Sequence, residues 1–328
     1  MDSFAKLILA LLILFLAACV FALYHSKKLI EENVFLDKHL LERGLDKPVI
    51  WLYYDTADVN SRNWYDFGAR SSRAINMPYM NLCYETIVAQ NQNQYRVEVI
   101  TGLAGVAQLL GIEALPARLQ NPIQSVNEAE INWIRAAVLA KFGGLWLDPH
   151  TICIRPFGVL PEDRTVFYGT DLDETYAGQE GTAIPGFRCI WAPQSNMPLF
   201  NDWELICRSR LDATAGGQQI RGDVKWDWTN LSSRYPGVQV DYAAEGGRKH
   251  GGKRIQLEDI LATGIDGKIP FNLPPYTIYV PLLWTELRDR EIFGWFLRMN
   301  EDQIMESDIT VRYLFEKGLI GPPVDIKA

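Results

Sequence analysis

The sequence feature that most constrains the fold is an uninterrupted apolar run, Val49–Tyr54, which ends at Asp55. A strand that is apolar at every position is buried on both faces, which is typical of a parallel sheet. Apolar residues at helical spacing follow over Pro78–Gln90, and Tyr95–Ile100 alternates like a second strand. This strand–helix–strand order predicts an α/β domain with a mostly parallel central sheet.

A second helix–strand unit ends in a carboxylate. A helix is predicted over Asn127–Phe142, because a capping residue and acidic residues begin it and one face is apolar. Gly143 and Gly144 end this helix, and the short apolar strand Leu145–Leu147 leads directly to Asp148. Asp148 is therefore expected at the carboxyl end of a buried strand, where ligands of open α/β sheets bind. Further strands are predicted at Val166–Tyr168 and Cys189–Ala192, and a further helix at Leu199–Leu211.

The N-terminal segment predicts a single membrane anchor. Ala5–Tyr24 is apolar apart from Lys6, and its length matches the ~20 residues that a bilayer-spanning helix needs. A cleaved signal peptide is the alternative, because residues 17–19 resemble a processing site, but the apolar run continues past them. Lys27 and Lys28 favour a cytosolic-facing C-terminal domain. The opposite, type II orientation would place the domain in an endomembrane compartment of the Golgi or ER type.

The predicted organisation is an anchor at 1–28, a helical stalk at 29–47 and one α/β domain at 48–320. With 328 residues, of which 48% are hydrophobic, the chain can bury one substantial core. Its net charge of -8 argues against nucleic-acid binding, which needs a surplus of Lys and Arg. An anionic ligand must then be held by a local site. The 10 Trp and 14 Tyr fit either a carbohydrate cleft or a large aromatic core.

The stretch from Arg135 to Asp148, with its Phe-Gly-Gly and Leu-Asp pairs, resembles an element of the DXD-motif glycosyltransferases. These include the capsular polysaccharide synthesis proteins, to which the chain looks closest, and mannosyltransferases related to yeast initiation enzymes. The resemblance covers most of residues 48–318. It implies a GT-A-like fold with a Rossmann-like sheet, and transfer of a hexose from a nucleotide-sugar donor to a glycan hydroxyl with retention of configuration. Other segments that carry the resemblance are Pro48–Trp51, Asn60–Trp64, Arg70–Arg73 and Trp295–Asp302.

The chemistry of such a transfer calls for a divalent ion, Mn²⁺ or Mg²⁺, to neutralise the diphosphate leaving group. The resemblance makes Asp148 the metal ligand and Arg135 a catalytic contact to the donor. The family motif has a second Asp two residues on, where this chain has His150. His150 could replace it, since imidazole binds Mn²⁺, or the site could use Asp148 alone. The structural alternative is that Asp148 caps a turn and His150 is a satisfied polar residue. Asn132 also replaces the acid that often precedes the family's helix arginine.

Further donor contacts are expected from four groups of residues. An aromatic pair and an acid at the end of the first strand are placed to hold a nucleoside, with core packing as the alternative for the tyrosines. Arginines after that strand could pair with the diphosphate or form surface salt bridges. The paired glycines would allow close backbone approach, and a histidine in a glycine-rich loop could fold over the phosphates. The predicted donor contacts are Tyr53, Tyr54, Asp55, Arg62, Arg70, Arg73, Gly143, Gly144 and His250.

Two other function classes stay open. The altered motif favours a membrane-anchored glycan-binding or scaffold relative that has lost catalysis, and a membrane-bound phosphotransferase is a further alternative. Asp171-Leu172-Asp173 matches a DXD pattern but lacks the preceding helix and Gly-Gly turn. The four cysteines outside the anchor are dispersed, which favours buried thiols over a zinc site or a disulfide framework.

Overall fold

The computed structural model describes residues 47–55, 77–120, 126–170, 184–213, 224–246, 255–264 and 269–322. The described residues from Pro48 onward belong to one compact unit. The predicted anchor and nearly all of the predicted stalk lie outside them, so both stay predictions. None of the helices in the described ranges is long and apolar enough to cross a membrane.

The centre of the unit is a six-stranded sheet in the order β2-β1-β3-β6-β5-β7. Only β6 runs antiparallel to its neighbours, and the other five strands share one direction. The predicted α/β class with a mostly parallel sheet is therefore confirmed. A small antiparallel sheet pairs β4 (Thr151–Cys153) with β8 (Tyr279–Pro281). The strands of the central sheet are β1 (Val49–Tyr54), β2 (Arg96–Thr101), β3 (Gly144–Leu147), β5 (Val166–Tyr168), β6 (Cys189–Ala192) and β7 (Gln239–Asp241).

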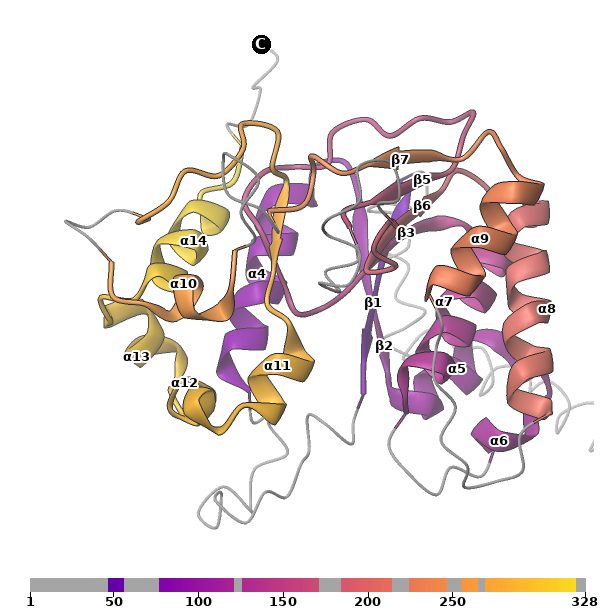
Figure 1. The fold of residues 1–328 in the computed structure, drawn as a ribbon, viewed down its shortest axis with the longest axis horizontal. Coiled ribbons are helices and arrows are strands. Elements are labelled where there is room, and N and C mark those ends of the chain that lie inside the picture. The colour runs from indigo at the N-terminus through magenta and orange to yellow at the C-terminus, as the bar shows by residue number, and fades with distance from the viewer. Residues whose placement is uncertain are drawn as a thin grey trace, which may run out of the picture. The chain divides into compact units, whose positions relative to one another are not determined.

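Helices cover both faces of this sheet (Figure 1). One face carries α5 (Gly102–Leu110), α6 (Ala117–Gln120), α7 (Glu128–Phe142), α8 (Pro198–Asp212) and α9 (Val224–Arg234). The other carries α4 (Pro78–Asn91), α10 (Leu257–Leu261), α11 (Trp284–Asp289), α12 (Gly294–Leu297), α13 (Glu301–Glu306) and α14 (Thr310–Leu319). Short 3₁₀ turns lie at Ile112–Ala114 and Glu291–Phe293.

Two hydrophobic clusters fill the spaces between the sheet and its helix layers. Successive strand residues point to opposite faces, so β1 sends Leu52 into one cluster and Trp51 into the other. In β3, Leu147 and Trp146 divide in the same way. Strands β1 and β3 are therefore held from both sides, which explains why the sequence shows uninterrupted apolar runs there.

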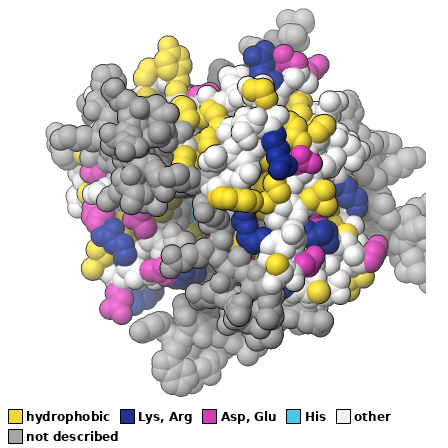
Figure 2. All heavy atoms as spheres, turned by 45° about the vertical axis from the view of Figure 1, so that its right-hand side comes forward, with side chains coloured by type: hydrophobic (Ala, Val, Ile, Leu, Met, Phe, Trp, Pro, Cys, Tyr) yellow, Lys and Arg dark blue, Asp and Glu magenta, His cyan; other side chains and the backbone are white. Residues whose placement is uncertain are grey.

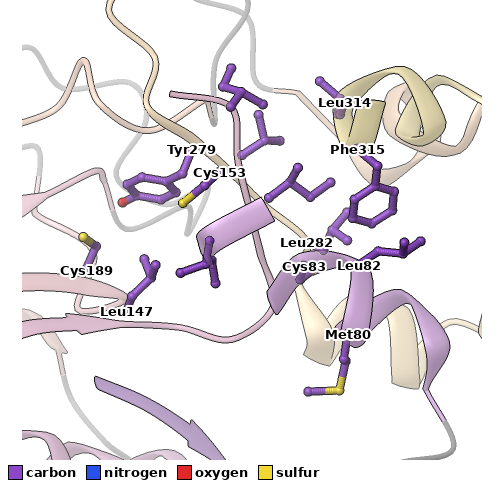
Figure 3. Close-up of a cluster of buried hydrophobic side chains, with 14 of the residues drawn as sticks. Met80, Leu82, Cys83, Leu147, Cys153, Cys189, Tyr279, Leu282, Leu314 and Phe315 are labelled. Carbon is purple, nitrogen blue, oxygen red and sulfur yellow. The ribbon is translucent and has the colours of Figure 1, made fainter. Parts of the chain in front are cut away.

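The cysteines of the described residues are free and buried, as predicted. Cys83, Cys153 and Cys189 lie in one cluster with Leu147 and Phe315, drawn from α4, β4, β6, β3 and α14 (Figure 3). Burial in this apolar environment raises the pKa of the Cys153 thiol to about 12. These thiols act as small hydrophobic side chains in the core.

Helix α7 forms for the local reasons that its sequence indicates. The Asn127 side chain accepts from the Glu130 backbone N–H at 3.1 Å, and the Glu130 carboxylate accepts from the Asn127 backbone N–H at 2.8 Å. This reciprocal capping box satisfies donors at the start of the helix. At the other end, Gly143 takes a φ of 66° and stops the helix.

Candidate functional site

Polar side chains gather at the edge of the sheet where the parallel strands end. Asp55 follows β1 and Asp148 follows β3, while Arg188 precedes β6, which runs the opposite way. Helix α7 returns toward this edge with its N-terminus, because the Val126 backbone N–H donates to Asp55 Oδ2 at 3.1 Å. The residues that begin α7 therefore lie at the same edge as Asp148, as the parallel topology requires.

Asp148 is held by its main chain and keeps part of its carboxylate open. Its backbone N–H donates to the carbonyl oxygen of Arg188 at 2.8 Å. Its Oδ1 accepts the backbone N–H of His150 at 2.8 Å, so the predicted turn-capping contact is present. Within the described part of the chain, Oδ2 accepts no hydrogen bond. Asp148 is half-buried and retains one carboxylate oxygen for a ligand.

Arg135 is a buried cation beside Asp148. Its side chain is only 3% exposed, and Nη1 donates to Asn132 Oδ1 and, at 3.5 Å, to the mostly exposed Glu128. The guanidinium also lies 5.6 Å from the ring centroid of Trp146. Burial lowers the pKa of Arg135, opposed by the charges of Glu128 and Asp148. The charge of this arginine is thus only loosely compensated by the protein.

Two buried donors on α7 have no acceptor among the described residues, namely Arg135 Nε and Asn132 Nδ2. Buried donors are normally paired, so a pair of orphans on adjacent turns of one helix calls for an explanation. Both side chains lie on α7, and the first turn of α7 lies at the same edge of the sheet as Asp148. An oxygen-rich ligand at this edge would supply the missing acceptors.

His150 bridges two layers of the structure. A hydrogen bond of 2.9 Å links its Nδ1 to the Tyr79 hydroxyl on α4, and its ring stacks on Trp284 of α11. The two ring centroids are 5.2 Å apart and the ring planes differ by 3°. Its carbonyl oxygen also accepts the Leu282 backbone N–H. Any metal contact would fall to the other nitrogen, Nε2.

Replacing His150 with Phe tests whether this ring is a bridge or a ligand. We expect His150→Phe to keep the stack on Trp284 and to lose the bond to Tyr79, lowering the free energy of unfolding by about 1 kcal/mol. Affinity for a nucleoside diphosphate with Mn²⁺ should fall by about threefold or less, equivalent to about 0.6 kcal/mol. Chemical denaturation and calorimetric titration measure the two effects. A loss of metal-dependent binding with stability unchanged would instead make His150 a ligand.

The described residues fit a divalent ion that is shared with a ligand. No group of three or more His, Cys, Asp or Glu side chains suited to a metal occurs among them. Asp148 Oδ2 is an open hard oxygen, the ligand type that Mg²⁺ and Mn²⁺ prefer. An ion here would take its remaining ligands from phosphate oxygens and water, as Mg²⁺ commonly does at phosphate sites.

The paired glycines lie at the other end of β3 from Asp148, and their predicted approach to the donor stays a prediction. Gly144 begins the strand and takes a φ of 96°. A Cβ at Gly144 would lie 2.7 Å from the Val49 carbonyl oxygen, and one at Gly143 would lie 2.8 Å from the Gln194 backbone. The tight helix-to-strand turn accounts for both glycines.

The residues at the end of β1 contribute to the packing of the core and to the position of the segment before α7. Tyr53 and Tyr54 are 4% and 6% exposed and belong to opposite hydrophobic clusters, so core packing, the alternative left open above, describes both rings. Asp55 anchors the segment before α7 through Val126. The predicted contacts of these residues to a nucleoside remain predictions.

Several predicted site residues lie outside the described residues, and two residues of the site were missed. Arg188 and Glu245, which pair near Asp148, carry no motif in the sequence. Arg188 stands next to a predicted strand, but only the reversed direction of β6 brings it to this edge. The predicted site residues outside the described ranges are Arg62, Arg70, Arg73 and His250, and the DXD-like pair Asp171 and Asp173 also lies outside them.

Comparisons with known proteins show a weak similarity to solved structures. No protein-family model and no curated protein matches the chain. Among solved structures, the chain is similar to the apo-form glycosyltransferase GlyE of Streptococcus pneumoniae TIGR4, with 10% sequence identity and a TM-score of 0.36. The match covers 83% of this chain and 60% of GlyE, so the chain spans less than two thirds of that protein. At this similarity the comparison assigns no function to the chain.

Together, the fold and the site define a class. The chain is an α/β protein with a mostly parallel sheet, and it gathers an open carboxylate and two largely buried arginines at the carboxyl edge. That arrangement suits a ligand that combines anionic groups with many oxygen atoms.

Proposed function

We propose that this chain is a glycosyltransferase with a GT-A-like fold, which moves a hexose from a nucleotide-sugar to a hydroxyl of a glycan. The observation that carries the proposal is Asp148, whose open carboxylate oxygen lies at the carboxyl edge of the sheet beside Arg135 and Arg188. The resemblance of the Arg135–Asp148 stretch to DXD-motif glycosyltransferases supports the same reading. The nucleotide, the hexose and the acceptor are left open.

The charge distribution supports a local anion site. The chain carries a net charge of -8. On the face that Figure 2 draws, Lys and Arg side chains of the described residues are interspersed with Asp and Glu. A diphosphate would therefore gain little from the protein's overall field and would depend on nearby cations. Arg135 is such a cation at the candidate site, whereas Arg188 is paired with Glu245.

Asp148 would hold the divalent ion through Oδ2, with Mn²⁺ and Mg²⁺ both suited to this ligand. When bound, the ion neutralises negative charge on the diphosphate as it leaves. Arg135 would add positive charge from α7, and the orphaned Asn132 Nδ2 and Arg135 Nε would donate to oxygens of the donor. These donors are fixed before the ligand arrives, which is how such sites stabilise developing charge.

The proposed reaction forms a bond between the anomeric carbon and an acceptor hydroxyl oxygen, and breaks the bond between that carbon and the diphosphate. The bonding electrons leave with the diphosphate, and the hydroxyl proton passes to a base or to the departing diphosphate. The contribution of the protein is to orient donor and acceptor and to stabilise the leaving charge.

A catalytically inactive glycan-binding relative is the second candidate. The observation that favours it is His150, which replaces the second motif acid and is engaged by Tyr79 and Trp284. Such a protein has no need of a nucleoside diphosphate or a metal. Metal-dependent nucleotide binding therefore separates the two candidates.

The first experiment is calorimetric titration of the full chain with a panel of nucleoside diphosphates that includes UDP and GDP, with and without Mn²⁺. We expect one member to bind selectively and only with the metal. Incubation of the corresponding nucleotide-sugars with glycan acceptors, followed by mass spectrometry, should then show a hexose added to the glycan. Well-folded protein that binds no member of the panel would support the inactive relative.

A further inference from the structure

An ion pair between Arg188 and the buried Glu245 lies beside Asp148. Arg188 Nη2 donates to Glu245 Oε1 at 2.8 Å and to the Thr170 carbonyl oxygen at 2.8 Å. The other carboxylate oxygen of Glu245 accepts the Tyr279 hydroxyl at 3.2 Å. The Glu245 side chain is 1% exposed and that of Arg188 is 19% exposed. Thr170 and Glu245 thus hold the guanidinium, and Tyr279 in turn holds the carboxylate of Glu245.

Gly169 makes room for this arrangement. It lies directly after β5 with a φ of 79°, and a Cβ there would overlap Glu245 Oε2 and approach the Tyr279 hydroxyl. The carboxylate of Glu245 therefore occupies the space that any side chain at position 169 would fill. A buried carboxylate is costly unless it is paired, and Arg188 supplies the opposite charge.

Arg188 is the direct cross-strand neighbour of Asp148. The antiparallel register pairs Leu147 with Cys189, so the next pair in the same register is Asp148 and Arg188. The Asp148 backbone N–H donates to the Arg188 carbonyl oxygen, as this pairing requires. Side chains directly opposite in this way have Cβ atoms about 5 Å apart, within reach of an Arg–Asp ion pair. The charge of Asp148 does act on Arg188, yet within the described residues Asp148 forms no ion pair. Arg188 is paired with Glu245 instead.

We propose that Glu245 is a positioning residue that sequesters Arg188, and so keeps the carboxylate of Asp148 open for a metal-bound nucleoside diphosphate. The proposal rests on the proposed function and adds to it a residue that no motif marks. Without the charge of Glu245, Arg188 is free to turn to its cross-strand neighbour. It then occupies the oxygen that a divalent ion needs, and the positive charge that remains repels the ion.

The test compares Glu245→Gln with the wild type in the full chain, using UDP and GDP with Mn²⁺. We expect the variant to need about tenfold more Mn²⁺ for half-maximal nucleotide binding, the size of effect found when groups that orient a metal ligand are changed. The double variant Glu245→Gln/Arg188→Gln should recover most of the wild-type metal affinity, because it removes the competing cation. A purely structural ion pair would not give this recovery of Mn²⁺ affinity.

Glu204→Gln is the matched control. Glu204 on α8 also accepts from an arginine, Arg208, at 2.7 Å and from an aromatic donor, Trp133 Nε1, at 2.7 Å. It should lose stability without a change in the Mn²⁺ requirement. Equal Mn²⁺ requirements for the wild type and Glu245→Gln would overturn the proposal, as would a double variant as weak as the single one.

A crystal structure of Glu245→Gln separates failure of this proposal from failure of the proposed function. We expect the Arg188 guanidinium within hydrogen-bond distance of the Asp148 carboxylate. A guanidinium that stays in its wild-type position would contradict sequestration even if nucleotides bind. If the guanidinium moves to Asp148 but the protein binds no nucleotide, the role of Glu245 in sequestering Arg188 is supported. Only the proposed glycosyltransferase function is then wrong.

Discussion

Asp148→Asn is expected to abolish binding of a nucleoside diphosphate in the presence of Mn²⁺. The amide keeps the shape of the side chain and can still accept the His150 N–H at Oδ1, but it loses the charge and the open carboxylate oxygen. Changes to the outer partners of metal ligands cost about 10–100-fold in affinity, so loss of the ligand itself should cost at least about 100-fold. Calorimetric titration with and without Mn²⁺ measures the effect.

Asp241→Asn is the control for this substitution. Asp241 ends β7 as Asp148 follows β3, and its carboxylate likewise accepts a backbone N–H two residues on, from Ala243 at 3.0 Å. The Asp241 variant should bind like the wild type. If Asp148→Asn also binds nucleotide with unchanged metal dependence, Asp148 is not the metal ligand and the proposed site is wrong.

Gly144→Ala is expected to cause the largest loss of stability, about 3 kcal/mol or more in the free energy of unfolding. An alanine must adopt the left-handed φ of 96°, and its Cβ would meet the Val49 carbonyl oxygen at 2.7 Å and Trp51 Nε1 at 2.9 Å. Val49 and Trp51 belong to the central strand β1, which is paired on both sides and cannot move away. Chemical denaturation gives the free energy directly.

Gly158→Ala isolates the conformational part of this loss. Gly158 has a φ of 69°, and nothing lies within 4 Å of a Cβ placed there. Its substitution should cost about 1 kcal/mol, the typical value for a residue forced into the left-handed region. Equal losses at the two positions would show that the contact with β1 contributes nothing.

The elements around the site could be predicted because their signals are local. The capping box of α7, the glycines that end it and the apolar residues of β3 all lie within one stretch of the chain. Those signals place Asp148 after a buried strand without any knowledge of the sheet order. The sequence could not show that the two glycines lie at the opposite end of β3 from Asp148, because they are only a few positions away from it along the chain.

The ion pair that lies near Asp148 could not be predicted, for a different reason. Arg188 and Glu245 are separated by 57 positions and meet only because β6 is reversed and the chain after β7 crosses to Tyr279 of β8. Charged residues before a strand are common, and no spacing rule links them to a distant carboxylate. The burial of Tyr53 and Tyr54 likewise depends on helix layers that come from later parts of the chain.

The reversal of β6 also affects how such a site can diversify. Because β5 runs toward the ligand edge and β6 runs away from it, the connection between them starts and ends at that edge. It needs no return helix across a face of the sheet. Its described ends, Thr170 and Arg188, meet at the site, so a change in the length of this connection acts at the ligand edge. The register of the strands and the packing of both helix layers would stay as they are.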